Sequence, residues 1–168
     1  MTFDAALLAK AEALLDACRQ RRLMLATAES CTGGLVAACL TAIAGASDVF
    51  ERGFVTYSNQ AKMEEIGVAA SILAAHGAVS EETARTMAEG TLRASAAHLA
   101  LSVTGIAGPS GGTAEKPVGL VHIAAARSGF PTLHRKLQLG PLGRGEIRLR
   151  SVAEILDLGL AQATRGEA

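Results

Sequence analysis

The stretch RLMLATAESCTGGLVAACLTAI, residues 22–43, passes from an apolar run through a turn of hydroxyl residues and glycines into a second apolar run. Residues 22–28 are short and mostly apolar, which is typical of a buried strand. The run from Leu35 to Ile43 predicts a helix that begins directly after the glycines. Strands that alternate with helices are the building units of α/β folds. The rest of the chain can be interpreted outward from this unit.

The same alternation continues on both sides of the stretch. Residues 4–20 have apolar side chains at helical spacing, and residues 53–58 have the composition of a second strand. Further helices are expected over 59–67, with Asn59 as the cap, over 71–76, over 80–95 and over 146–160. Three more strands are expected over 99–104, 118–126 and 132–139, the last two as an antiparallel hairpin. We therefore predict one domain over 1–168, a three-layer α/β/α fold with a mixed, mostly parallel five-stranded sheet.

Composition excludes several classes of protein. The 168 residues are 49% apolar and 19% charged, which excludes a disordered chain. Sixteen basic and sixteen acidic residues cancel and only 3% are aromatic, so we expect no nucleic-acid partner. No apolar run approaches the ~18 residues of a membrane span, and no secretory signal precedes the first helix, so a cytoplasmic location is expected. Three cysteines without a CxxC pair predict neither a metal site nor a disulfide framework.

The turn Thr27–Gly34 could perform chemistry, because it lies where a strand ends and a helix begins. The unpaired N–H groups of a helix start can hold a phosphate or an oxyanion. The turn also offers three nucleophiles, Ser30, Cys31 and Thr32. A helix cap with a tight turn explains the pattern equally well. No histidine lies near these residues in a recognisable motif, which disfavours a Ser–His–Asp triad.

Two further segments are candidates for a site. In Thr56–Lys62, Lys62 follows Ser58 by one helical turn and could point back toward the strand end. Desolvation there would make this lysine a base, although a surface lysine on a capped helix fits the pattern better in isolation. The loop from Thr104 to Thr113 follows a central strand and is rich in glycine and hydroxyl groups, which favours ligand contact. Arg144 or Arg148 could hold a phosphate, and a solvated basic face is the alternative.

Taken together, these motifs resemble the CinA C-terminal domain family, whose stand-alone members are known as PncC. The matching segments are AESCTGG at 28–34, TYSNQAK at 56–62, GAVS at 77–80 and TGIAGPSGGTAEKPVG at 104–119. The resemblance covers roughly residues 5–160, and several long motifs coincide. The chain is too short for the family's larger N-terminal domain, so the stand-alone form is expected.

The resemblance implies an amidase that converts nicotinamide mononucleotide and water to nicotinate mononucleotide and ammonia, in pyridine nucleotide salvage. It implies no cofactor, no metal and a homo-oligomer, of which we favour a dimer. Ser30 would be the nucleophile, Lys62 the general base, and Tyr57 would orient the lysine or relay a proton. Glu29 would be a partner of Lys62. The Cys31–Gly34 backbone would supply oxyanion donors, and the 105–113 loop, with Ser110, would hold the nucleotide.

The substrate-binding residues expected on this basis lie in three segments. They are Glu29, Cys31, Thr32, Gly33, Gly34, Thr104, Gly105, Gly108, Gly111, Gly112, Thr113 and Arg144. One position departs from the family pattern, because Gly143 stands where an aspartate often precedes the arginine, and the consequence expected from this change is weaker phosphate binding. A nucleotide-binding regulatory module without hydrolysis is therefore the alternative function. Cys31 as the nucleophile is the alternative mechanism.

Overall fold

The strand, turn and helix predicted over 22–43 form the centre of the protein, whose computed structural model describes residues 3–166. β1 (Leu25–Glu29) is buried at every position, and α2 (Leu35–Thr41) follows after a turn over 30–34. β1 pairs in parallel with β2 (Phe50–Val55) on one side and with β3 (Leu99–Gly105) on the other. The predicted α/β unit is confirmed, with its strand in the interior of the sheet.

The five strands form one sheet in the order β2-β1-β3-β4-β5. β4 (Leu120–Arg127) runs antiparallel to β3, and β5 (Leu133–Gln138) runs antiparallel to β4. Four strands therefore point in one direction and β4 opposes them. This confirms the predicted mixed, mostly parallel sheet and the hairpin that ends it.

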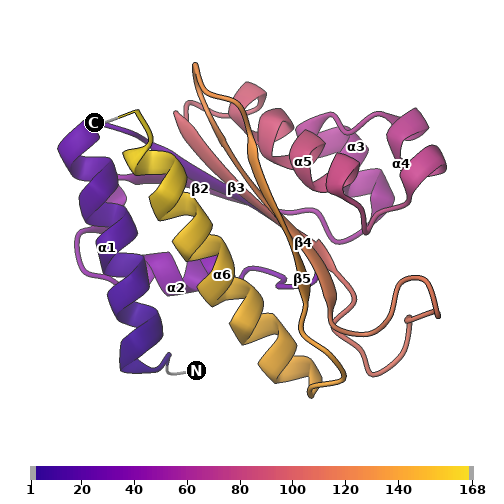
Figure 1. Cartoon of the computed structure of the whole chain (residues 1–168). Helices are drawn as coiled ribbons and strands as arrows, with labels where there is room; N and C mark the ends of the chain where they lie inside the picture. The colour runs from indigo at the N-terminus through magenta and orange to yellow at the C-terminus, as the bar shows by residue number, and fades with distance from the viewer. Residues whose placement is uncertain (1–2, 167–168) are drawn as a thin grey trace.

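Helices cover both faces of the sheet, so the predicted three layers are present (Figure 1). One layer holds α1 (Ala5–Arg21), α2 and α6 (Arg144–Thr164). The other layer holds α3 (Asn59–Ile66), α4 (Ala70–His76) and α5 (Glu81–Arg93). The largest apolar core lies under α1 and α6, where Leu14, Leu101 and Ile155 are fully buried. None of the helices described over residues 3–166 is long and apolar enough to cross a bilayer.

Element boundaries differ locally from the expectation. Ser58, and not Asn59, caps α3, because the Ser58 hydroxyl accepts a hydrogen bond from the N–H of Ala61 at 3.0 Å. β2 starts before the expected strand, and a short 3₁₀ helix, η1 (Ala46–Asp48), precedes it. The Ser80 cap of α5 is confirmed by its 3.1 Å bond from the N–H of Thr83. These shifts leave the predicted element order intact.

Candidate functional site

The carboxyl ends of the three parallel strands meet at one edge of the sheet. Glu29, the last residue of β1, is in register with Val55 of β2 and Val103 of β3. The three predicted motifs leave these strand ends, so the sheet brings them together although they lie far apart in sequence. The chain runs from β1 to β2 on one side and returns to β3 on the other. In open α/β sheets ligands bind beside such a reversal of strand order.

A cavity of about 250 Å³ opens at this edge, close in size to small-molecule sites of ~300–1,000 Å³. Its walls come from the 30–34 turn, the start of α3, the segment before α5, the glycine-rich loop and the start of α6. The lining residues are Ser30, Cys31, Tyr57, Asn59, Lys62, Ala78, Val79, Thr104, Gly105, Ile106, Ala107, Gly108, Ser110, Gly111 and Arg144.

Ser30 and Lys62 are in hydrogen-bond contact within this cavity. The Lys62 Nζ atom lies 3.1 Å from Ser30 Oγ and 2.8 Å from the carbonyl oxygen of Thr56. Lys62 is only 1% exposed, whereas Ser30 is partly exposed to the cavity. Within residues 3–166 no carboxylate forms an ion pair with Lys62. The lysine is therefore a buried amine with uncharged partners.

Burial lowers the pKa of the Lys62 ammonium, because desolvation penalises the charged form. The neutral amine can donate one N–H to the Thr56 carbonyl and direct its lone pair at the Ser30 hydroxyl. A base at hydrogen-bond distance from a hydroxyl is the arrangement that activates a serine nucleophile. The Ser30–Lys62 contact that the family resemblance implies is thus present in the geometry.

Glu29 does not contact Lys62, which corrects one expectation. Its carboxylate accepts hydrogen bonds from the N–H groups of Gly34, Val36 and Ala37 at 2.8–3.0 Å. Successive residues of a strand face opposite sides of the sheet. Ala28 packs in the cluster with Ile66 of α3, so Glu29 faces the α2 layer. There the free N–H groups of a helix start stabilise the anion.

The supply of free N–H donors in the turn is smaller than predicted. The Gly33 N–H donates to the Ser30 carbonyl at 3.1 Å, and the Gly34 N–H is bonded to Glu29. In the part of the chain that the structure describes, the N–H groups of Cys31 and Thr32 donate to no other residue. The expected oxyanion donors therefore narrow to these two.

Arg148 holds the carbonyl side of the same turn. Its guanidinium donates to the carbonyl of Cys31 at 3.1 Å and to that of Thr32 at 2.8 Å. Arg148 does not line the cavity. In this structure Arg148 is therefore not placed to meet a phosphate in the cavity, and its role there stays a prediction.

Arg144 and Tyr57 form a second contact at the rim. Arg144 donates to the Tyr57 hydroxyl at 3.0 Å and to the carbonyl of Gly108 at 2.8 Å. Tyr57 is 60% exposed, and its hydroxyl is bonded to Arg144 and not to Lys62. The expectation that Tyr57 orients the lysine is not met in this geometry. Arg144 is the cation that a bound anion would meet at the rim.

The conformation of the glycine-rich loop is fixed by close contacts within the segment from Thr104 to Val118. A Cβ atom at Gly108 would lie 2.6 Å from Val118, and one at Gly112 would lie 2.8 Å from the Val118 nitrogen. These glycines are needed because the loop folds back on itself. The Thr113 hydroxyl accepts from the N–H of Lys116, and the Thr104 hydroxyl donates to the carbonyl of Ala78. The loop is thus a formed wall of the cavity.

Six of the expected substrate-binding residues lie outside the cavity wall: Glu29, Thr32, Gly33, Gly34, Gly112 and Thr113. They shape the turn and the loop behind the wall. Five lining residues were not named individually by the sequence reasoning, although the last two belong to the 105–113 loop that it expected to hold the nucleotide: Asn59, Ala78, Val79, Ile106 and Ala107. A signal was available, because all five lie inside the quoted motifs.

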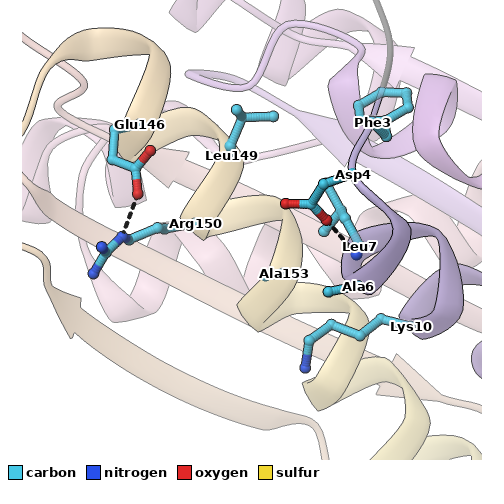
Figure 2. Close-up of a pocket in the computed structure, with 9 residues that line it drawn as sticks. All are labelled: Phe3, Asp4, Ala6, Leu7, Lys10, Glu146, Leu149, Arg150 and Ala153. Carbon is cyan, nitrogen blue, oxygen red and sulfur yellow. Dashed lines mark hydrogen bonds and ion pairs between the residues drawn. The ribbon is translucent and has the colours of Figure 1, made fainter.

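A second cavity, of about 300 Å³, lies between α1 and α6 (Figure 2). Its polar groups are engaged within the protein: Glu146 pairs with Arg150 at 2.7 Å, and Asp4 accepts from the N–H of Leu7. Lys10 pairs with Asp157 at 2.6 Å. No serine or cysteine lines this cavity. The Ser30–Lys62 cavity is therefore the better candidate site.

Cys31 also borders the candidate site but is a poor nucleophile. Burial raises the pKa of its thiol to about 12, so the reactive thiolate is scarce at neutral pH. The helix start expected to favour the thiolate is occupied by the Glu29 carboxylate. The structure therefore favours Ser30 over the alternative nucleophile.

Comparison with known proteins gives one consistent family. The family model described as "CinA C-terminal domain" matches residues 8–162. A "CinA-like protein" from Kosmotoga olearia is 48% identical over 87% of this chain and 35% of its own length. Another, from Syntrophobacter fumaroxidans, is 58% identical over 63% of this chain and 25% of its own length. The chain thus spans between about a quarter and about a third of the curated relatives it matches.

Solved structures agree over nearly the whole chain. The competence/damage inducible protein CihA from Agrobacterium tumefaciens is 48% identical, with a TM-score of 0.93 over 96% of this chain and 98% of that one. The competence damage-inducible protein A from Klebsiella pneumoniae is 32% identical, with a TM-score of 0.90 over 96% and 99%. The match of fold, motifs and family model shows that this chain belongs to the CinA C-terminal domain family.

Proposed function

We propose that the protein is an amidohydrolase that converts nicotinamide mononucleotide and water to nicotinate mononucleotide and ammonia. The observation that carries the proposal is the contact between Ser30 Oγ and the buried Lys62 Nζ at 3.1 Å, with no carboxylate paired to that lysine among residues 3–166. A neutral lysine at that distance can take the serine proton, and a cavity leads to the hydroxyl. The resemblance to the family supplies the substrate.

The first half of the proposed reaction forms an acyl-enzyme. Ser30 Oγ attacks the carboxamide carbon while Lys62 accepts the hydroxyl proton. The carbonyl oxygen becomes an oxyanion, for which the free N–H of Cys31 on the cavity wall is one donor and the free N–H of Thr32, which follows it in the turn behind the wall, is the other. The C–N bond then breaks, and Lys62 returns its proton to the leaving nitrogen, so that ammonia departs. Ser30 is left as an ester of the nicotinate group.

The second half consumes water. Lys62 takes a proton from a water molecule, whose oxygen attacks the ester carbon through the same oxyanion geometry. The bond to Ser30 Oγ breaks, and the proton on Lys62 returns to the serine. The products are the carboxylic acid and the original dyad, and the acid then loses its proton to the released ammonia, which gives the carboxylate and ammonium. The scheme needs no cofactor, because one base transfers every proton.

The nucleotide part of the substrate is assigned to the opposite wall of the cavity. Arg144 offers a permanent cation, and its guanidinium fork suits a phosphate. Ser110 and Gly111 of the glycine-rich loop add polar groups on the same side. Gly143 leaves the N-cap of α6 without a side chain, so no carboxylate from that position competes with a phosphate for Arg144.

The test is ammonia release from nicotinamide mononucleotide by wild type, Ser30→Ala and Lys62→Met. Ser128→Ala, which removes an exposed hydroxyl in the β4–β5 turn, is the matched control. We expect turnover by wild type and the control, and loss of at least ~10³-fold in both dyad variants. Turnover retained in Ser30→Ala would refute the mechanism. A folded wild type that binds the nucleotide without hydrolysis would support the regulatory module instead. The cytoplasmic location and the homo-oligomeric state, for which we favour a dimer, remain predictions. Light scattering on the purified protein can test the oligomeric state.

A further inference from the structure

The turn that carries Ser30 is held from two opposite sides by buried or half-buried charges. On its N–H side, the Glu29 carboxylate binds three N–H groups at the start of α2. On its C=O side, the Arg148 guanidinium binds the carbonyls of Cys31 and Thr32. Neither side chain lines the cavity, so neither contacts a ligand there. Their contacts instead determine the shape of the turn.

Arg148 fixes the direction of two peptide groups. In a trans peptide the C=O and the following N–H point in opposite directions. The bond to the Cys31 carbonyl therefore sets the direction of the Thr32 N–H, which is one of the two free donors in the turn. The bond to the Thr32 carbonyl sets the direction of the Gly33 N–H, which closes the turn on the carbonyl of Ser30.

The helix that carries Arg148 provides a firm anchor. α6 is 21 residues long, and Ile147, Ser151 and Val152 beside Arg148 are fully buried. Arg144, one turn earlier on the same helix, binds the carbonyl of Gly108 in the glycine-rich loop. Two arginines four residues apart thus tie the 30–34 turn and the glycine-rich loop, on opposite walls of the cavity, to one packed helix.

We propose that Arg148 is a positioning residue for the reaction at Ser30, acting through the 30–34 turn, with Glu29 as its counterpart on the N–H side. The inference rests on the proposed function in that Ser30 is taken as the nucleophile. It assigns Arg148 to holding the oxyanion donors in place and not to binding substrate. Its loss should lower the rate of the chemical step with little effect on substrate affinity.

The experiment compares wild type with Arg148→Gln, Arg148→Lys and Arg150→Gln. Arg150 lies on the same helix and pairs with Glu146 at the exposed surface, so its variant removes an equal charge without touching the turn. Three quantities are measured: kcat and KM for nicotinamide mononucleotide, the rate at which phenylmethylsulfonyl fluoride labels Ser30, and amide hydrogen exchange over residues 30–37. Thermal melting of each variant reports that it is folded.

For Arg148→Gln we expect kcat and the labelling rate to fall by about 10–100-fold, with KM within about threefold of wild type. Exchange over the turn should quicken. Arg148→Lys should recover part of the rate, because an ammonium keeps the charge but lacks the planar fork. Arg150→Gln should match wild type in every measurement.

The outcomes separate this inference from the proposed function. If wild type is labelled at Ser30 but does not hydrolyse the nucleotide, the substrate assignment fails, and the labelling rates still test Arg148. If Arg148→Gln is folded and reacts like wild type in labelling, the positioning role is overturned whatever its hydrolysis rate. A rise in KM at unchanged kcat would also overturn it, because that result indicates substrate binding. If wild-type Ser30 is neither labelled nor active, both proposals fail.

Discussion

Replacing Lys62 by methionine should change how the stability of the protein depends on pH. Lys62 is 1% exposed, and burial lowers its pKa from the ordinary value of 10.5. Between the lowered pKa and 10.5, the unfolded chain binds this proton and the folded protein does not. The free energy of unfolding therefore rises with pH in that window. The slope reaches ~1.4 kcal/mol per pH unit from this group alone.

Other groups titrate in the same range with the opposite sign. Burial raises the pKa of Cys18 and Cys31 to about 12 and that of Cys39 to about 11. Above the ordinary thiol pKa of ~8.5 the folded protein holds these protons more tightly, so stability falls as pH rises. Wild type and Lys62→Met share all three thiols. The effects of Cys18 and Cys39 therefore cancel in the difference between the two proteins, which reports Lys62 together with its weaker electrostatic coupling to Cys31.

The assay is urea unfolding of wild type, Lys62→Met and Lys136→Met at intervals across ~pH 7–10.5. Lys136 is an exposed lysine on β5, so its variant removes one positive charge without uncovering a buried site. Lys62→Met also leaves the Thr56 carbonyl without its donor, which costs about 1–3 kcal/mol at every pH. The relevant quantity is therefore how the difference in unfolding free energy between wild type and Lys62→Met changes with pH, and not its absolute value.

We expect the free energy of unfolding of wild type to rise relative to that of Lys62→Met as pH rises. The difference between wild type and Lys136→Met should stay constant across the same range. A constant difference between wild type and Lys62→Met across the range would refute the reasoning. That result would mean that Lys62 keeps its ordinary pKa. It would then be an ammonium at neutral pH, unable to accept the Ser30 proton.

Three further results follow from single contacts. Gly90→Ala should lower the free energy of unfolding by about 1–3 kcal/mol in urea, because the added Cβ would lie 1.9 Å from the Ile66 carbonyl oxygen. In the control, Gly159→Ala, the added Cβ meets only the ends of the Leu101 and Leu14 side chains, which can move. Its free energy of unfolding should stay within about 1 kcal/mol of the wild-type value. Gly143→Asp should stabilise α6 by about 0.3–1 kcal/mol, since the N-cap position is open and extended; a drop in melting temperature would contradict this. Cys31 should react with iodoacetamide near neutral pH far more slowly than a small-molecule thiol, which peptide mass analysis can follow.

Much of the fold follows from local pattern. The buried run at 25–29 and the capped start of α5 at Ser80 were predictable, because apolar periodicity and hydroxyl caps act over a few residues. The start of β2 was not, because Phe50–Gly53 carries two charges and gains its strand pairing from β1. The order of the strands in the sheet likewise depends on which faces the helices cover.

For the candidate site, too, some features follow from local sequence pattern and others depend on tertiary packing. Ser30 and Lys62 were predicted from motifs, and their contact follows from parallel strand ends and one turn of α3. The alternation of β1 already places Glu29 on the face opposite Ala28, so its separation from Lys62 was predictable and was missed. The bonds of Arg148 span more than a hundred residues. They depend on how α6 packs across the sheet, which no local pattern specifies.

The burial of Lys62 favours the proposed enzyme over a module that only binds a nucleotide. A lysine that holds a phosphate must be charged, and hydration or a carboxylate partner keeps it so. Here no carboxylate pairs with Lys62 within residues 3–166, and desolvation favours the neutral amine. A neutral amine binds an anion poorly but removes a proton well. The cavity also has the guanidinium of Arg144 on its wall, whose planar fork suits a phosphate. Accepting a proton beside Ser30 and binding an anion at the rim are different tasks. The buried environment of Lys62 suits the first task, and the position of Arg144 at the rim suits the second.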